Sequence, residues 1–137
     1  MQQAEGDAGA ALATLGRALE RYPGRLPVVY AYVEMLQQAG RHREALAALE
    51  DPVRAHPEDP RLRALQARAY AALGKRLLQH QAQAELYLLR GSVPAAIEQL
   101  QLARAAGDGD FYELSAVEAR LKELRARHAQ ELRDARR

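Results

Sequence analysis

The sequence contains no cysteine and no tryptophan, and only one phenylalanine among its 137 residues. Without cysteine the chain can form no disulfide and offers no thiol nucleophile or cysteine-based zinc site, so its redox compartment is not indicated. Aromatic residues make up 5% of the chain, which leaves few of the side chains that β-strands favour. No apolar run approaches the roughly 20 residues of a membrane-spanning helix, and residues 1–13 lack the basic and apolar segments of a signal peptide.

What the sequence does contain is typical of helices. Hydrophobic residues make up 48% of the chain, and alanine, the strongest helix former, is the commonest residue. The 20 basic residues are nearly balanced by 18 acidic ones, so the net charge of +2 gives little basis for binding nucleic acid. The length is that of one domain with a continuous hydrophobic core.

A pattern of small and apolar residues recurs along the chain. Its three copies are Gly6, Ala11, Leu15, Ala18 and Pro23; Gly40, Ala45, Leu49 and Pro57; and Gly91, Ala96, Leu100 and Ala103. The first two copies are 34 residues apart, and Tyr70 and Tyr87 lie four residues before Gly74 and Gly91. The glycine ends a helix, the alanine permits close helix packing, the leucine fills the gap, and the proline prevents continuation. This period is that of the tetratricopeptide repeat (TPR), a helical hairpin.

The repeat predicts an all-α fold, a right-handed α-solenoid of antiparallel helical hairpins. About seven helices are expected, near residues 7–21, 26–39, 42–55, 60–73, 75–90, 93–106 and 110–134. The chain is predicted to be one TPR domain, with repeats near 6–25, 26–59, 60–90 and 75–109 and a long capping helix over 110–137. Because the first repeat holds only its second helix, we expect a fragment of a longer chain.

Two irregularities interrupt the repeat. Gly74 and Gly91 are 17 residues apart, half a period, so the array is expected to change phase at a helix over residues 75–90. The polar content of that helix favours an irregular and exposed structure. Pro52, inside the third helix, is expected to kink it or end it early.

The last helix carries an apolar stripe on one side and charges on its other faces. The stripe consists of Phe111, Leu114, Val117, Leu121, Leu124, His128 and Leu132. Charged outer faces suit a helix that caps a solenoid.

Several stretches are more specific than a general TPR. They are residues 27–40, Glu44-Ala45, residues 65–73 (LQARAYAAL), residues 83–91 (QAELYLLRG), Ala96-Ile97 and residues 119–124 (ARLKEL). Together they resemble the C-terminal TPR domain of BepA/YfgC-type periplasmic zinc metalloproteases, the beta-barrel assembly-enhancing proteases. The resemblance implies a periplasmic location and a parent protein whose H-E-x-x-H domain, absent here, performs proteolysis. It also implies that the TPR domain contacts that protease domain, the outer-membrane assembly machinery or client polypeptides.

In TPR arrays, the first helices of successive repeats line a concave groove. The matching positions here are Pro27, Tyr30, Glu34, Gln37 and Gln38 in the second repeat and Arg61, Ala64, Arg68, Ala71 and Ala72 in the third. Tyr30 can contact a peptide or form a half-buried wall, and the wall is favoured. Arg61 and Arg68 can hold a peptide carboxylate or form a solvated stripe, with Arg68 paired to Glu34, and the stripe is favoured. Tyr30 and Glu34 occupy positions where a chaperone-type carboxylate clamp needs lysine and asparagine.

No catalytic, metal or cofactor site is predicted. The four histidines are not paired around a glutamate at i, i+4, and the hydroxyl residues have no base partner in the sequence pattern. We therefore expect a protein partner and no enzyme activity in this chain.

Two other functions stay open. One is a free-standing TPR adaptor of another bacterial assembly, and the other, less favoured, is a helical-repeat nucleic-acid binder. The arginine-rich end, residues 120–137, is better explained as a salt-bridged helix face than as an RNA or membrane contact, because acidic residues interleave with its arginines. The apolar face of the first helix, at Leu12, Leu15 and Leu19, could drive dimerisation of the fragment.

Overall fold

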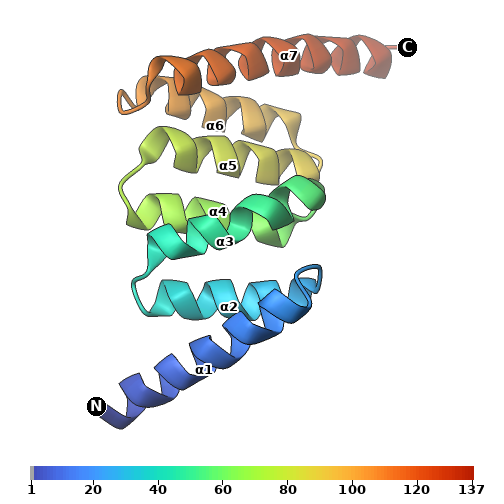
Figure 1. The fold of residues 1–137 in the computed structure, drawn as a ribbon. Helices are drawn as coiled ribbons and strands as arrows, with labels where there is room; N and C mark the ends of the chain where they lie inside the picture. Colours follow the sequence, from blue (N-terminus) through green and yellow to red (C-terminus); the bar gives the residue numbers. More distant parts are fainter. Residues whose placement is uncertain (1) are drawn as a thin grey trace.

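A computed structural model describes residues 2–137, with side chains from residue 6 onward, and in this part the chain forms seven helices joined by short loops, without strands (Figure 1). The helices are α1 (Gln2–Arg21), α2 (Leu26–Gln38), α3 (His42–Ala55), α4 (Pro60–Ala72), α5 (Arg76–Leu89), α6 (Val93–Ala105) and α7 (Phe111–Ala135). They stack in chain order, so that the two termini lie at opposite ends of the array. The predicted all-α array of helical hairpins with a long last helix is confirmed.

Local signals set the helix ends as predicted. Gly40, Gly74 and Gly91 have φ of 75°, 71° and 84°, in the left-handed region where glycine carries no Cβ penalty, and each follows a helix. Asp59 and Ser92 cap α4 and α6 with their side chains. The predicted role of Gly6 is wrong, because α1 begins at Gln2 rather than near residue 7 and Gly6 lies inside it. A Cβ on Gly6 would meet no atom within 4 Å, so no close approach requires glycine there.

Pro52 does not end α3 early. The helix continues to Ala55, and the amide of His56 donates to the Pro52 carbonyl at 2.8 Å. Pro52 lies in the last turn, so its missing N–H removes a single hydrogen bond near the helix end. The cost is small enough for the helix to continue.

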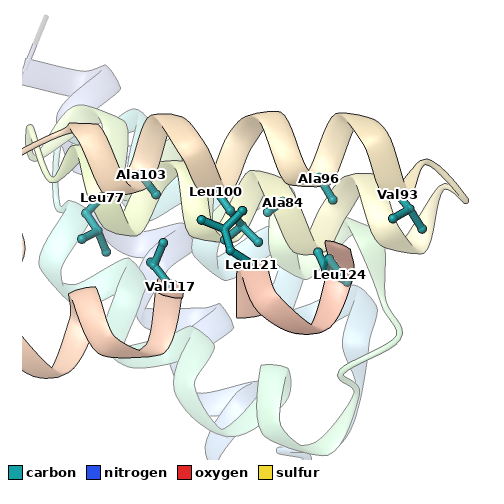
Figure 2. Packing of buried hydrophobic residues seen from close by; sticks show 9 residues of the cluster. All are labelled: Leu77, Ala84, Val93, Ala96, Leu100, Ala103, Val117, Leu121 and Leu124. Atoms are coloured by element: carbon teal, nitrogen blue, oxygen red, sulfur yellow. The ribbon is translucent and has the colours of Figure 1, made fainter. Parts of the chain in front are cut away.

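The buried side chains form two separate clusters. The first cluster joins the helices α1, α2, α3 and α4, and consists of Leu12, Val29, Val33, Leu36, Ala45, Leu49, Leu62 and Leu65. The second joins α5, α6 and α7, whose side chains point toward one another in Figure 2, and consists of Leu77, Ala84, Val93, Ala96, Leu100, Ala103, Val117, Leu121 and Leu124. Between the clusters, α4 and α5 pack closely, and each contributes a buried alanine, Ala67 and Ala82. Such local packing is typical of repeat proteins.

The helix contacts place the change of phase between α4 and α5. Besides its neighbours in the chain, α2 contacts α4 and α5 contacts α7, whereas α4 and α6 do not approach each other. In a regular TPR array the first helices of successive repeats touch. The contacts of α2 with α4 and of α5 with α7 are of this kind, so α5 takes the role of a first helix that α6 would have in a regular array. The half-period between Gly74 and Gly91 accounts for this change of phase.

The expectation that residues 75–90 form an irregular, exposed helix is wrong. α5 is a regular helix between α4 and α6, and most of its polar side chains are half-buried. His80 Nδ1 lies 2.9 Å from Gln99 Oε1 on α6, and Glu85 binds Arg120 on α7. These partners satisfy two of the polar side chains of α5, which helps the helix to tolerate burial on both sides.

The apolar stripe of α7 is only partly covered. Val117, Leu121 and Leu124 are buried, whereas Phe111 is 78% and Leu132 49% exposed. α7 has 25 residues against 13 in α6, and its C-terminal end extends past the rest of the stack (Figure 1). The stripe is therefore longer than the helix that covers it.

Asp108, in the loop before α7, caps the start of α5 from a distance of more than 30 residues in the chain. Its carboxylate accepts from the amides of Leu77 at 3.0 Å and Arg76 at 2.6 Å. Lys75 occupies the N-cap position of α5, but its side chain forms no capping hydrogen bond. These two backbone hydrogen bonds, first that of Leu77, lower the pKa of the Asp108 carboxyl. The contact fixes the α6–α7 loop on the start of α5.

The depressed pKa predicts a pH dependence of stability. A carboxyl with a lowered folded pKa stabilises the fold above its unfolded pKa of about 3.9, and this contribution is lost as the pH falls through the folded pKa. Asp108→Ala should therefore lower the urea midpoint at pH 7, and the difference from the wild type should shrink as the pH falls below about 4. Urea titrations at pH 7, 5 and 3 measure this difference, and a difference that stays constant across that range would contradict the assignment.

Candidate functional site

The candidate site is the face shared by α2 and α4. Gln37 of α2 is 7% exposed, and its side-chain amide donates to the Leu65 carbonyl of α4 at 2.9 Å. A buried side chain that donates a hydrogen bond to the backbone of another helix fixes the two helices relative to each other. Gln37 was predicted to line the groove, but its burial makes it a structural link between α2 and α4.

The starts of α2 and α4 are joined by a network of four side chains. The Tyr30 hydroxyl donates a hydrogen bond to the Asp59 carboxylate, which also caps α4. The Arg61 guanidinium lies 4.4 Å from the centre of the Tyr30 ring and binds Glu34 at 2.7 Å. Burial, followed by the hydrogen bond to Asp59, raises the pKa of Tyr30 to about 12. Its phenol is therefore neutral at ordinary pH and donates within this network.

The expected ion pair between Glu34 and Arg68 is not formed, because Glu34 forms an ion pair with Arg61 instead. Both side chains of that ion pair remain partly exposed, at 56% for Arg61 and 36% for Glu34, so the pair contributes little to stability. Its hydrogen bond to Glu34 raises the pKa of Arg61, which stays charged. Three of the predicted groove residues therefore bind one another.

Arg68 is an exposed cation of this face and, unlike Arg61, does not bind Glu34. Within residues 6–137 it forms no ion pair. The rest of the exposed strip is small or uncharged, and it consists of Pro27, Gln38, Ala71 and Ala72, with Ala64 half-buried. Small side chains leave room for a polypeptide to approach the helix backbone, and a guanidinium among them can bind a carboxylate through two hydrogen bonds.

Two of the four arginines of α7 form ion pairs. Arg120 binds Glu85 of α5 at 2.9 Å and Glu123 at 2.8 Å, and Arg127 binds Glu131 at 3.0 Å. This arrangement is that of a salt-bridged helix face, the preferred interpretation of the C-terminal arginines.

Other functional chemistry has little support in the part of the chain that the structure describes. That part contains no group of three or more His, Cys, Asp or Glu side chains placed to hold a metal ion. None of its helices is long and apolar enough to cross a membrane. Ser92 serves as a helix cap, and the Thr14 hydroxyl donates to the Ala10 carbonyl within α1.

Sequence reasoning missed two contacts between helices, one at the α2–α4 face and one at the start of α5. Asp59 was recognised as a helix cap but not as the partner of Tyr30, which lies 29 residues away. Asp108 was not singled out, although it stands between Gly107 and Gly109 in a loop where an aspartate commonly serves as a cap. Both contacts cross between helices, so the local pattern could not reveal them.

The fold and the comparison with known families define the class of this protein. It is an all-α, TPR-type helical array, and residues 2–69, nearly half of the chain, match the family model described as Tetratricopeptide repeat. The matched range includes α1, α2, α3 and most of α4, and so contains the α2–α4 face except Ala71 and Ala72. No curated protein matches the chain. TPR arrays use extended surfaces to bind other proteins, so the match indicates a protein–protein interaction module.

Proposed function

We propose that this chain is a non-catalytic protein-interaction module that needs no cofactor and binds an extended polypeptide along the α2–α4 face. The match to the TPR family over residues 2–69 carries the proposal. The exposed strip of small residues around Arg68 supports this choice of face. The network of Tyr30, Glu34 and Arg61 then forms the rigid wall of the groove, and Arg68 together with Gln38 contacts the ligand.

The exposed Arg68 predicts that the ligand of the α2–α4 face carries a carboxylate. A charge-assisted hydrogen bond contributes roughly 1.5 to 3 kcal/mol, so Arg68→Ala should weaken binding of a peptide carboxylate by about 10-fold or more. Twelve-residue peptides selected by phage display against the wild type supply the probes, and fluorescence anisotropy measures their affinity.

Arg54→Ala serves as the matched control, because Arg54 is 78% exposed on α3. It should leave the affinity unchanged. Equal affinities for the Arg68→Ala and Arg54→Ala proteins would reject the α2–α4 face as the site.

We further propose that the module is the C-terminal TPR domain of a BepA/YfgC-type periplasmic zinc metalloprotease that acts in outer-membrane protein assembly and quality control. The stretches quoted above and the half-period before Gly91 support this proposal. In that setting its partners are the parent protease domain, the assembly machinery or client polypeptides, and its location is the periplasm. The reading frame upstream of Met1 should then encode a signal peptide and an H-E-x-x-H motif. Further TPR repeats in their place would favour a free-standing adaptor.

The proposed domain organisation is a single TPR domain over residues 1–137, divided as the repeat pattern predicts. We also propose that the isolated chain dimerises through α1. Leu15 and Leu19 of α1 are half-buried, and cavities of about 410 and 500 Å³ lie on either side of Leu12, between α1 and α2. Light scattering that gives a monomer mass at every concentration would exclude the dimer.

A further inference from the structure

The change of phase gives the second half of the array its own pair of touching helices. α5 and α7 run in the same direction, with their starts at the same side of the stack, the left in Figure 1. They contact each other past α6, as α2 and α4 do past α3. In the first half that arrangement forms the candidate groove. The second half therefore has a corresponding surface, which we call the α5–α7 face.

Charged and apolar side chains lie together on the α5–α7 face. Glu85 and Arg120 join the two helices through a pair of hydrogen bonds of 2.9 and 3.1 Å. Leu78 and Leu89 lie seven residues before and four residues after Glu85, so all three are on one side of α5. Tyr112 lies eight residues, about two turns, before Arg120 on α7.

This face leaves large apolar groups in contact with solvent. Leu89 is 37% and Tyr112 81% exposed, and Phe111, whose ring centre lies 5.8 Å from that of Tyr112, is 78% exposed. Leu89 ends α5 and Tyr112 lies at the start of α7, so the exposed apolar groups lie at the two ends of the face. Exposed aromatic side chains are common anchors of protein interfaces. The α2–α4 face has no comparable residue, because its Tyr30 is half-buried and bound to Asp59.

A cavity of about 150 Å³ lies at one end of the α5–α7 face. Its lining joins the start of α5 to the start of α7 and consists of Lys75, Leu77, Leu78, Asp108, Gly109 and Glu113. A cavity of roughly this volume accommodates a benzene-sized group, so one apolar side chain fits. The lining holds the carboxylates of Asp108 and Glu113 and the ammonium group of Lys75. Asp110 adds a carboxylate and Arg76 a guanidinium nearby, so the carboxylates are in excess by one. Farther along α7, the Glu123 side chain binds Arg120 at 2.8 Å and is 64% exposed.

We infer that the α5–α7 face is a second protein-binding surface, and that its partner is an amphipathic helical segment that carries leucine-like side chains beside lysine or arginine. The apolar side chains bind over Leu89 and Tyr112 and in the cavity at Leu78. The basic side chains bind near Glu113 and Glu123. The excess of carboxylates around the cavity contrasts with the chain as a whole, whose net charge is +2, and a basic partner complements it. This partner differs in chemistry from the carboxylate-bearing peptide proposed for the α2–α4 face.

Three designed 14-residue helical peptides test the inference in the full chain. The first combines leucine and lysine, the second leucine and glutamate, and the third serine and lysine. Only the leucine–lysine peptide should bind, and its binding should shift the amide resonances of α5 and α7 in NMR spectra while leaving those of α2 and α3 in place. Binding of the leucine–glutamate peptide with equal affinity, or shifts centred on α2 and α4, would overturn the inference.

Substitutions of exposed residues provide the second arm. The double variant Leu89→Ser/Tyr112→Ser should weaken binding of the leucine–lysine peptide at least 10-fold. Leu102→Ser/Leu132→Ser is the matched control, because those leucines are 50% and 49% exposed elsewhere on the surface, and it should change affinity less than twofold. Glu113→Gln/Glu123→Gln retains a side chain suited to the capping box of α7 and should weaken binding several-fold. Arg68→Ala should have no effect, which separates this surface from the α2–α4 face. Equal loss in the double variant and its control would refute the assignment.

Discussion

Replacing Leu100 with alanine should lower the free energy of unfolding by about 2 to 5 kcal/mol. Leu100 of α6 is fully buried at the centre of the second cluster, which joins α5, α6 and α7, and Leu121 and Ala84 point toward it (Figure 2). Truncation removes the transfer free energy of the lost methyl and methylene groups and leaves a cavity that regular helices can only partly close. The loss is a large fraction of the roughly 5 to 15 kcal/mol that stabilises an ordinary domain.

Urea or thermal unfolding followed by circular dichroism measures this change. Leu102→Ala on the same helix is the control, because Leu102 is 50% exposed and its truncation should cost less than about 0.5 kcal/mol. A cost for Leu100→Ala no larger than that of the control would mean that Leu100 is not part of a packed core.

Hydrogen exchange should show where the stability is lost. Because the buried side chains form two clusters, Leu100→Ala should reduce the protection of α6 and α7 amides more than that of α2 and α3 amides. Equal loss of protection in all these helices would instead indicate a single cooperative unit.

The parts of the fold that depend on local chemistry could be predicted from the sequence. A helix ends where Gly40 or Gly74 allows a left-handed residue, and begins where Asp59 or Ser92 can cap it. The change of phase was also predicted, because the 17-residue interval between Gly74 and Gly91 is a property of spacing alone. Such signals need no knowledge of the neighbours.

The burial of α5 and the detailed pairing of the candidate site could not be predicted in this way. The polar side chains of α5 are compatible with burial because His80 meets Gln99, 19 residues away, and Glu85 meets Arg120, 35 residues away. Glu34 was expected to pair with Arg68, but the offset between α2 and α4 places it against Arg61. A repeat pattern identifies the positions that face a groove but not which of them bind one another.

Gly109→Ala should destabilise the fold by about 1 to 3 kcal/mol, although the substitution adds only a methyl group to a loop. A Cβ at residue 109 would overlap Leu77 Cδ1 and lie 3.3 Å from Leu77 Cγ. Leu77 is 2% exposed and belongs to the second cluster of buried side chains, so movement of its side chain away from the new Cβ disturbs the packing of its neighbours. The neighbouring Asp108 holds the same loop on the start of α5, which prevents the backbone from relaxing.

Gly24→Ala is the matched control, because a Cβ at that position meets no atom within 4 Å. It should change the free energy of unfolding by less than about 0.5 kcal/mol. The double variant Leu77→Ala/Gly109→Ala separates overlap from backbone preference, since removing the leucine side chain makes room for the new methyl group. Adding Gly109→Ala to Leu77→Ala should then cost less than adding it to the wild type, with a coupling of about 0.5 to 3 kcal/mol. Additive costs in this cycle would place the origin of the effect in the loop backbone, and would show that Gly109 is not needed for the contact between the α6–α7 loop and α5.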